Sequence, residues 1–164
     1  MVSEAFNWLK KLTLERELAE KAEALAEELH KDCGGCAQMT LKALQKVLGL
    51  EAQGSFKVAS ALSGGVTLAG EVCGALLGAI MAIGLAMGRS KLEPTSSSAE
   101  YSRAMEAVKK VFDQFKEEFG SVRCRDIHAK LFGRYYDLTR KNGDSSLRVG
   151  LGLSAAMYVK LLPD

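Results

Sequence analysis

The feature that most constrains the fold is an uncharged run of seventeen residues, from Val72 to Gly88. It contains the spacing Gly74-x-x-x-Gly78, and small residues at this spacing let neighbouring helices approach closely. The run is slightly short for a transmembrane span, and no basic residue flanks its N-terminal side. Because strongly amphipathic patterns lie on both sides of it, we predict a buried central helix wrapped by other helices.

Apolar residues at helical spacing predict the helices around this run. Leu14 to Leu29 carry one apolar stripe, which predicts a helix over residues 14–31 with Thr13 as its N-cap and a shorter helix over residues 3–11 before it. Gly34-Gly35 then interrupts the pattern. Further helices are expected over residues 36–50, 55–62, 101–119, 121–132 and 147–162.

Two of these helices have start signals in the sequence. Ser97-x-x-Glu100 matches a capping box before residues 101–119, and Ser121 can cap the helix that follows. The apolar stripe predicted to face the core from residues 101–119 consists of Tyr101, Met105, Val108, Phe112, Phe115 and Phe119. We therefore predict a single all-α domain over residues 1–164, a compact bundle of about five to seven helices around the Gly/Ala-rich run.

Charge and composition exclude some functional classes. The 164 residues carry a formal net charge of +2, with the basic excess mainly between Arg123 and Lys141, and this gives little reason to expect nucleic acid as a partner. Residues 1–12 contain no apolar segment with a small-residue cleavage site, so we expect no secretory signal and a cytoplasmic protein. In that reducing compartment, cysteines serve more often as ligands or redox groups than as permanent cross-links.

Four cysteines carry the candidate chemistry. Cys33 and Cys36 form a Cys-x-x-Cys pair, whereas Cys73 and Cys124 lie far apart in sequence. Such a pair can close a disulfide, hold half of a tetrahedral metal site or transfer electrons as a dithiol. Cys36, Cys73 and Cys124 are each predicted at the start of a helix, where free N–H groups and the helix dipole favour thiolate.

Other polar side chains are expected near these cysteines. His30 and His128 stand three and four residues from a cysteine, so either could be an extra metal ligand, although a surface or capping role is favoured. Glu71 could relay a proton, although the ordinary role of an acid at a helix N-terminus is favoured. Arg123 and Arg125 would add positive charge at the cysteine between them.

Three named cysteine motifs do not fit. Ala37 follows Cys36 where a covalent haem attachment sequence has histidine. A helix rather than a strand precedes the pair, which argues against a thioredoxin fold. A zinc ribbon needs two Cys-x-x-Cys pairs, and there is one.

Three stretches around the cysteines match a known pattern. They are CGGCAQM at Cys33–Met39, GEVCGA at Gly70–Ala75 and RCRD at Arg123–Asp126. In order and spacing they resemble the C-GCAxxG-C-C family of redox-active proteins over about residues 20–130. The resemblance implies an all-helical domain with a cysteine-lined redox centre, and related domains attached to multihaem cytochromes point to iron–sulfur or electron-transfer chemistry. Thr40 stands where the motif has its last glycine, and no cysteine follows Cys124.

Our leading hypothesis is a redox-active protein whose site consists of Cys33, Cys36, Cys73 and Cys124. These residues would act as catalytic thiols in thiol–disulfide exchange, or as ligands of an iron–sulfur cluster in electron transfer. Both versions need a redox partner protein, and exposed aromatic residues over 101–119 would favour a homodimer. The alternatives are a structural zinc site on the same cysteines and a membrane-associated accessory protein that uses the uncharged run. No substrate follows from the residues, so whether the protein is an enzyme stays open.

Overall fold

The computed structural model describes the backbone of residues 2–50, 52–135 and 137, and the side chains of these ranges from residue 13 onward. This part of the chain contains six α-helices, two short 3₁₀ helices and one isolated β-bridge, but no strand. The helices are α1 (Val2–Cys33), α2 (Cys36–Leu48), α3 (Ser55–Val58), η1 (Ala59–Leu62), α4 (Gly74–Met87), η2 (Thr95–Ser97), α5 (Ala99–Phe119) and α6 (Cys124–Phe132). The predicted all-α fold class is confirmed.

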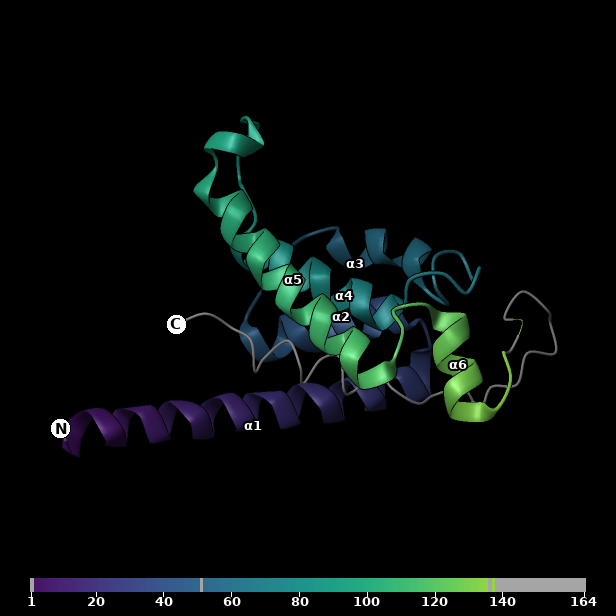
Figure 1. Ribbon diagram of the computed structural model, residues 1–164, viewed down its shortest axis with the longest axis horizontal. Coiled ribbons are helices and arrows are strands. Elements are labelled where there is room, and N and C mark those ends of the chain that lie inside the picture. The colour runs from purple at the N-terminus through teal and green to yellow at the C-terminus, as the bar shows by residue number, and fades with distance from the viewer. Residues whose placement is uncertain (1, 51, 136, 138–164) are drawn as a thin grey trace.

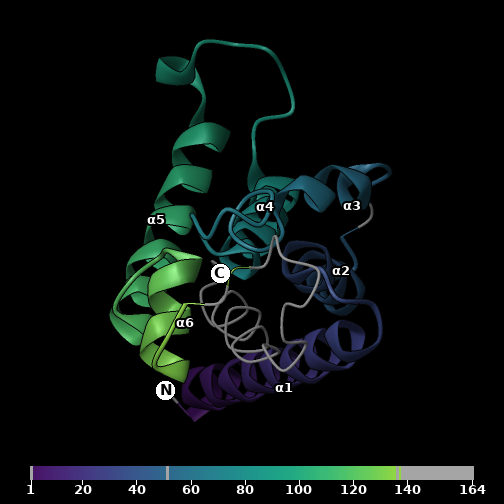
Figure 2. The ribbon, with the colours of Figure 1, turned by 90° about the vertical axis from the view of Figure 1, so that its right-hand side faces the viewer.

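Helix α4 is the centre of the bundle, as the uncharged run predicted. It packs against α2 on one side and α5 on the other, while α2 also packs against α1 (Figure 2). The close approach of α4 to α2 requires glycine at position 78, because a Cβ there would lie 2.5 Å from the carbonyl oxygen of Ala37. Within the described residues, α4 and the other helices are each too short or too polar to cross a membrane.

The core is formed mainly by four helices, α1, α2, α4 and α5, and small residues lie at many of their contacts. Alanines of α1 lie against α2, whereas α5 contributes larger side chains against α4. The buried side chains include Ala19, Ala22, Ala26, Leu41, Leu44, Leu76, Ala79, Ala82, Ile83, Val111, Phe115 and Phe119. Ala37 and Leu76 belong to this core, so the N-terminal ends of α2 and α4 are packed into it.

The predicted break at Thr13 is wrong. Residues 2–33 form one continuous helix, α1, whose first half extends beyond the other helices (Figure 1). No glycine or proline lies in residues 2–33, so nothing interrupts the run of backbone hydrogen bonds at Thr13. The helix ends instead at Gly34 and Gly35, both of which have left-handed φ angles, 68° and 79°.

Both predicted caps of the later helices are wrong by one or more residues. The N-cap of α5 is Ser98, whose Oγ accepts the amide of Tyr101, while the Ser97 hydroxyl donates to Pro94. Ser121 lies outside α6, which begins at Cys124. Its hydroxyl accepts the amide of Arg123 and so supports the turn before the helix.

The stripe predicted for α5 is shifted at two positions. Met105 is 44% exposed, and Ala104 and Val111 are buried instead. Phe115 and Phe119 lie in the core as predicted. The helix predicted over residues 147–162 lies outside the described residues.

Candidate thiol site

Cys36, Cys73 and Cys124 each lie at the beginning of a helix. Cys36 and Cys124 are the first residues of α2 and α6, and Cys73 is the N-cap of α4. The predicted position of all three at helix starts is confirmed. Free amide groups and the positive end of each helix dipole therefore face the neighbourhood of these sulfurs.

A short backbone pairing places the starts of α4 and α6 side by side. Val72 and Arg123 form an antiparallel bridge, in which the amide of Cys73 donates to Val122 (2.8 Å) and the amide of Cys124 donates to the carbonyl oxygen of Glu71 (2.7 Å). Cys73 and Cys124 are therefore the residues that directly follow the two bridged residues. Sequence periodicity could not reveal this contact, because the bridge joins single residues far apart in the chain.

Glycines bring the third cysteine, Cys36, against the other two. A Cβ on Gly74, the residue after Cys73, would lie 2.4 Å from Cys36 Sγ. The amide of Gly64 donates to Cys36 Sγ at 3.3 Å, and a Cβ on the adjacent Gly65 would lie 2.8 Å from Cys124 Cβ. Glycine at these positions is what lets the backbone reach the sulfurs.

Cys33 is placed differently. It is the last residue of α1 and its side chain is exposed, whereas Cys36 lies across the Gly34-Gly35 turn at the start of α2. Of the four thiols, it is the one a large partner could reach first.

The turn that carries Gly64 and Gly65 is left-handed over five residues. Gly64, Gly65, Val66, Thr67 and Leu68 all have φ between 49° and 74°. An L-residue with a side chain loses about 1–2 kcal/mol in this conformation. Strain of this kind persists where the surrounding contacts hold it, and it is found most often at functional sites.

We expect Thr67→Gly to stabilise the protein by about 0.5–1 kcal/mol, because relief of left-handed strain exceeds the extra entropy of glycine in the unfolded chain. Thr67 is exposed, so little packing is lost. Urea unfolding measures the change. Ala61→Gly in η1, also exposed but with an ordinary φ, is the matched control and should lose about 0.5–1 kcal/mol. A loss of stability in Thr67→Gly would contradict the strained turn.

The inner thiols hold their protons tightly. Burial raises the pKa of Cys73 to about 11, with a further rise from Cys36 and an opposing effect of the amides of Leu76 and Ala75. Burial likewise raises the pKa of Cys124 to about 12, and the charges of Cys73 and Cys36 add to the rise. Cys33 contributes to neither value. At neutral pH both inner cysteines are therefore thiols. The prediction of thiolates at these helix starts is wrong for Cys73 and Cys124, because burial outweighs the helix dipole. Reaction at Cys124 needs a proton acceptor.

His128 lies where it could accept that proton. Its Nε2 is 3.6 Å from Cys124 Sγ, and its ring stacks against Tyr135 with centroids 6.1 Å apart. Burial lowers the pKa of His128, so its imidazole is neutral at pH 7. The spacing of four residues on one helix was the sequence signal for this pair.

Two arginines beside Cys124 bind Glu71 rather than a sulfur. Arg123 Nη2 lies 3.3 Å and Arg125 Nη2 2.5 Å from Glu71 Oε1. Arg125 also donates to the carbonyl oxygens of Ala69 (2.7 Å) and Gly70 (3.3 Å), at the end of the left-handed turn. Reasoning from the sequence assigned these arginines to the charge around Cys124 and missed the backbone contacts.

The described side chains do not form a metal site. Among them, no group of three or more His, Cys, Asp or Glu residues is arranged so that it could hold a metal ion. As placed, the described side chains do not form the four-ligand arrangement that zinc or an iron–sulfur cluster commonly takes.

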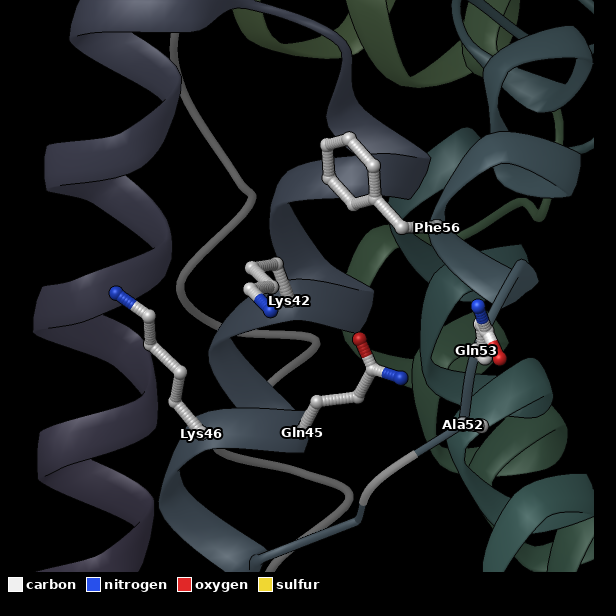
Figure 3. Close-up of a pocket in the computed structure, with 6 residues that line it drawn as sticks. All are labelled: Lys42, Gln45, Lys46, Ala52, Gln53 and Phe56. Carbon is white, nitrogen blue, oxygen red and sulfur yellow. The ribbon is translucent and has the colours of Figure 1, made fainter.

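A pocket of about 430 Å³ lies elsewhere, between α2 and the start of α3 (Figure 3). No cysteine, histidine or carboxylate is among the residues that line it. They are Lys42, Gln45, Lys46, Ala52, Gln53 and Phe56. Gln45 Nε2 donates a hydrogen bond to Ser55 Oγ at 2.9 Å.

Comparison with known proteins identifies the family of this chain. A family model described as "Putative redox-active protein (C_GCAxxG_C_C)" matches residues 35–147, a range that includes Cys36, Cys73 and Cys124. An uncharacterized protein of Archaeoglobus fulgidus is 29% identical over 119 residues, which cover 70% of this chain and 79% of that protein. No solved structure matches the chain. The chain belongs to the C_GCAxxG_C_C family, the family to which this description applies.

Proposed function

We propose that this protein is a thiol–disulfide relay that exchanges two electrons with the disulfide of a redox partner protein. The observation that supports the proposal most directly is the convergence of Cys36, Cys73 and Cys124 from three separate helix starts. The exposed Cys33 lies next to this group in sequence and supplies an outer thiol. A relay needs free thiols in its resting state, which suits a reducing compartment such as the cytoplasm.

The outer pair reacts first. The Cys33 thiolate attacks one sulfur of the partner's disulfide, a new S–S bond joins the two proteins, and the partner's other sulfur leaves as a thiolate that takes up a proton. Cys36 then attacks Cys33 Sγ and releases the partner's second thiol. The partner has gained two electrons, and the outer pair is now a disulfide.

The oxidation then moves inward. Cys73 attacks Cys36 Sγ, which lies against Gly74, and Cys33 leaves as a thiolate that takes up the proton lost by Cys73. Cys124 next attacks Cys73 Sγ, and Cys36 is the leaving group. His128 takes the proton from Cys124, while the amide of Gly64 and the start of α2 stabilise negative charge on the departing Cys36 sulfur. The product is a Cys73–Cys124 disulfide with the outer pair reduced.

The test follows the disulfides through time. Reduced protein is oxidised without oxygen by glutathione disulfide, quenched in acid, alkylated and mapped by peptide mass spectrometry. We expect the Cys33–Cys36 disulfide to appear first and Cys73–Cys124 to replace it. Cys33→Ser should slow the first oxidation by about tenfold or more, because the remaining thiols are less exposed. Cys124→Ser should stop the process at the outer disulfide.

The same preparation separates the relay from its alternatives. Metal analysis and an ultraviolet–visible spectrum, taken before and after reduction, should show a colourless and metal-free protein. Iron with sulfide and a visible band that is bleached on reduction would reject the relay and show that the protein binds an iron–sulfur cluster. Stoichiometric zinc would replace it with a structural metal site. Oxidation of Cys33→Ser at the wild-type rate would show that Cys33 is not the thiol that reacts first with the partner's disulfide.

A further inference from the structure

Arg125 makes several hydrogen bonds to the end of the left-handed turn, in addition to its ion pair with Glu71. Its backbone amide and its Nε both donate to the carbonyl oxygen of Gly70, at 3.0 Å and 3.3 Å. Its Nη2 donates to the carbonyl oxygen of Ala69 and to the Glu71 carboxylate. The planar guanidinium thus binds three successive residues of the segment, a geometry that lysine cannot reproduce.

Two further hydrogen bonds connect Gly70, which Arg125 binds, to the sulfur of Cys36. The amide of Gly70 donates to the carbonyl oxygen of Gly64 at 3.0 Å, and the amide of Gly64 donates to Cys36 Sγ at 3.3 Å. In parallel, the amide of Glu71 donates to the carbonyl oxygen of Gly65, which packs against Cys124. The end that Arg125 holds is therefore hydrogen-bonded to the end that touches the thiols.

The turn needs such a restraint. Val66, Thr67 and Leu68 are exposed residues in a left-handed conformation, so their own side chains do little to hold it. Backbone hydrogen bonds from Thr67 to Ala61 and from Leu68 to Ser63 hold the first part of the turn. At the end of the turn, Gly70 is the residue hydrogen-bonded to Gly64, so release of Ala69 and Gly70 would loosen the contact of Gly64 with Cys36.

We propose that Arg125 is the positioning residue of the thiol site: by binding the carbonyl oxygens of Ala69 and Gly70, it holds the left-handed turn so that the Gly64 amide points at Cys36 Sγ. The inference rests on the proposed relay for its consequence, because Cys36 is the leaving group in the inward step. Arg125 itself touches no sulfur and is assigned no chemical step.

The chain offers a matched control in Arg123. It binds the same Glu71 oxygen and is similarly exposed, but its side chain contacts no carbonyl oxygen of the turn among the described residues. Arg125→Gln and Arg123→Gln therefore remove the same charge next to the same carboxylate. They differ in whether the turn loses side-chain hydrogen bonds, because of the two arginines only Arg125 donates from Nε and Nη2 to carbonyl oxygens of the turn. The backbone amide of residue 125 still donates to Gly70 in both variants. Arg125→Gln also removes the guanidinium that lies 5.9 Å from the centroid of the Tyr135 ring.

The first measurement is hydrogen exchange of the Gly64 amide in the full chain. We expect Arg125→Gln to speed this exchange about tenfold or more, with core amides of α2 and α5 unchanged, whereas Arg123→Gln leaves Gly64 as in the wild type. Arg125→Lys should fall between them. If Arg125→Gln does not fold, Arg125→Lys carries the comparison. Unchanged exchange at Gly64 in the Arg125 variants would overturn the inference even if the relay is correct.

The second measurement has a readout that general destabilisation would not move. Bimolecular oxidation at Cys33 by glutathione disulfide should be unchanged in Arg125→Gln, while the shift of the disulfide to Cys73–Cys124 should slow about tenfold, as expected for one lost hydrogen bond to a charged group. Equal slowing of both steps, or equal slowing in Arg123→Gln, would contradict a positioning role. Faster exchange at Gly64 in a protein that forms no inner disulfide would retain the positioning of the turn and reject the relay.

Discussion

Gly78→Ala is expected to destabilise the protein by about 2–3 kcal/mol, although alanine is the better helix former by about 1 kcal/mol. The added Cβ would lie 2.5 Å from the carbonyl oxygen of Ala37 and 3.2 Å from the amide of Leu41. Both contacts are with the backbone of α2, so no side chain can rotate out of the way. The two helices must separate, and urea unfolding at neutral pH measures the cost.

Gly84→Ala is the control on the same helix. A Cβ there meets nothing within 4 Å among the described residues, so the substitution should stabilise the protein by about 0.5–1 kcal/mol through helix propensity alone. The opposite signs of the two changes separate the packing of α4 on α2 from the intrinsic preference of the backbone. A gain in stability for Gly78→Ala would mean that the helices are not in contact at this point.

The central position of α4 could be predicted because it depends on composition. A run without charge that carries Gly74 and Gly78 is stable only where its whole circumference is covered and where neighbours approach closely. The ends of α2 and α5 could also be predicted from neighbouring residues alone, since Gly49 and Gly120 adopt the left-handed C-cap conformation that favours glycine. Such features are read from one stretch at a time.

The arrangement around the thiols could be predicted only in part. Three cysteines at helix starts follow from local signals. The bridge between Val72 and Arg123 is a tertiary contact between segments with no strand periodicity. The left-handed turn contains Val66 and Leu68, which local preference would place in another conformation, so only the surrounding hydrogen bonds account for it.

Thr40 illustrates the same limit in one residue. It stands where the family motif has its last glycine. The side chain is fully buried, and its Cβ would lie 3.1 Å from a Cβ on Gly78. A glycine on α4 thus makes the room that a glycine on α2 would otherwise provide. The compensation is visible only once the two helices are seen to pack together.

We expect the protein to lose stability steeply above about pH 9, and to do so because of Cys73 and Cys124. In the unfolded chain these thiols ionise near 9.0, whereas in the folded protein their pKa values are about 11 and about 12. Between these limits the unfolded state releases protons that the folded state keeps, so rising pH favours unfolding. The stabilising contribution is complete below pH 9 and is lost as the pH approaches the folded pKa values.

The size of the effect follows from the linkage between protonation and folding. At about pH 10.5 each inner thiol should cost about 2 kcal/mol of the free energy of unfolding, since one pKa unit corresponds to about 1.4 kcal/mol. Urea unfolding under reducing conditions, repeated from about pH 7.5 to 10.5, measures the slope. The double variant Cys73→Ala/Cys124→Ala should have a much flatter profile over this range.

Cys33→Ser is the matched control, because it removes a cysteine whose side chain is exposed and which does not contribute to the raised pKa values. Its profile should follow that of the wild type, while lysine and tyrosine ionisation affects all the variants alike. Parallel profiles for the wild type and the double variant would show that the two thiols titrate in the folded protein as they do in the unfolded chain. The inner cysteines would then be reachable by solvent, and His128 would no longer be needed to accept a proton from Cys124. A steep loss confined to proteins that retain Cys73 and Cys124 would mean that these thiols are neutral at working pH, so the inward transfer depends on a local base.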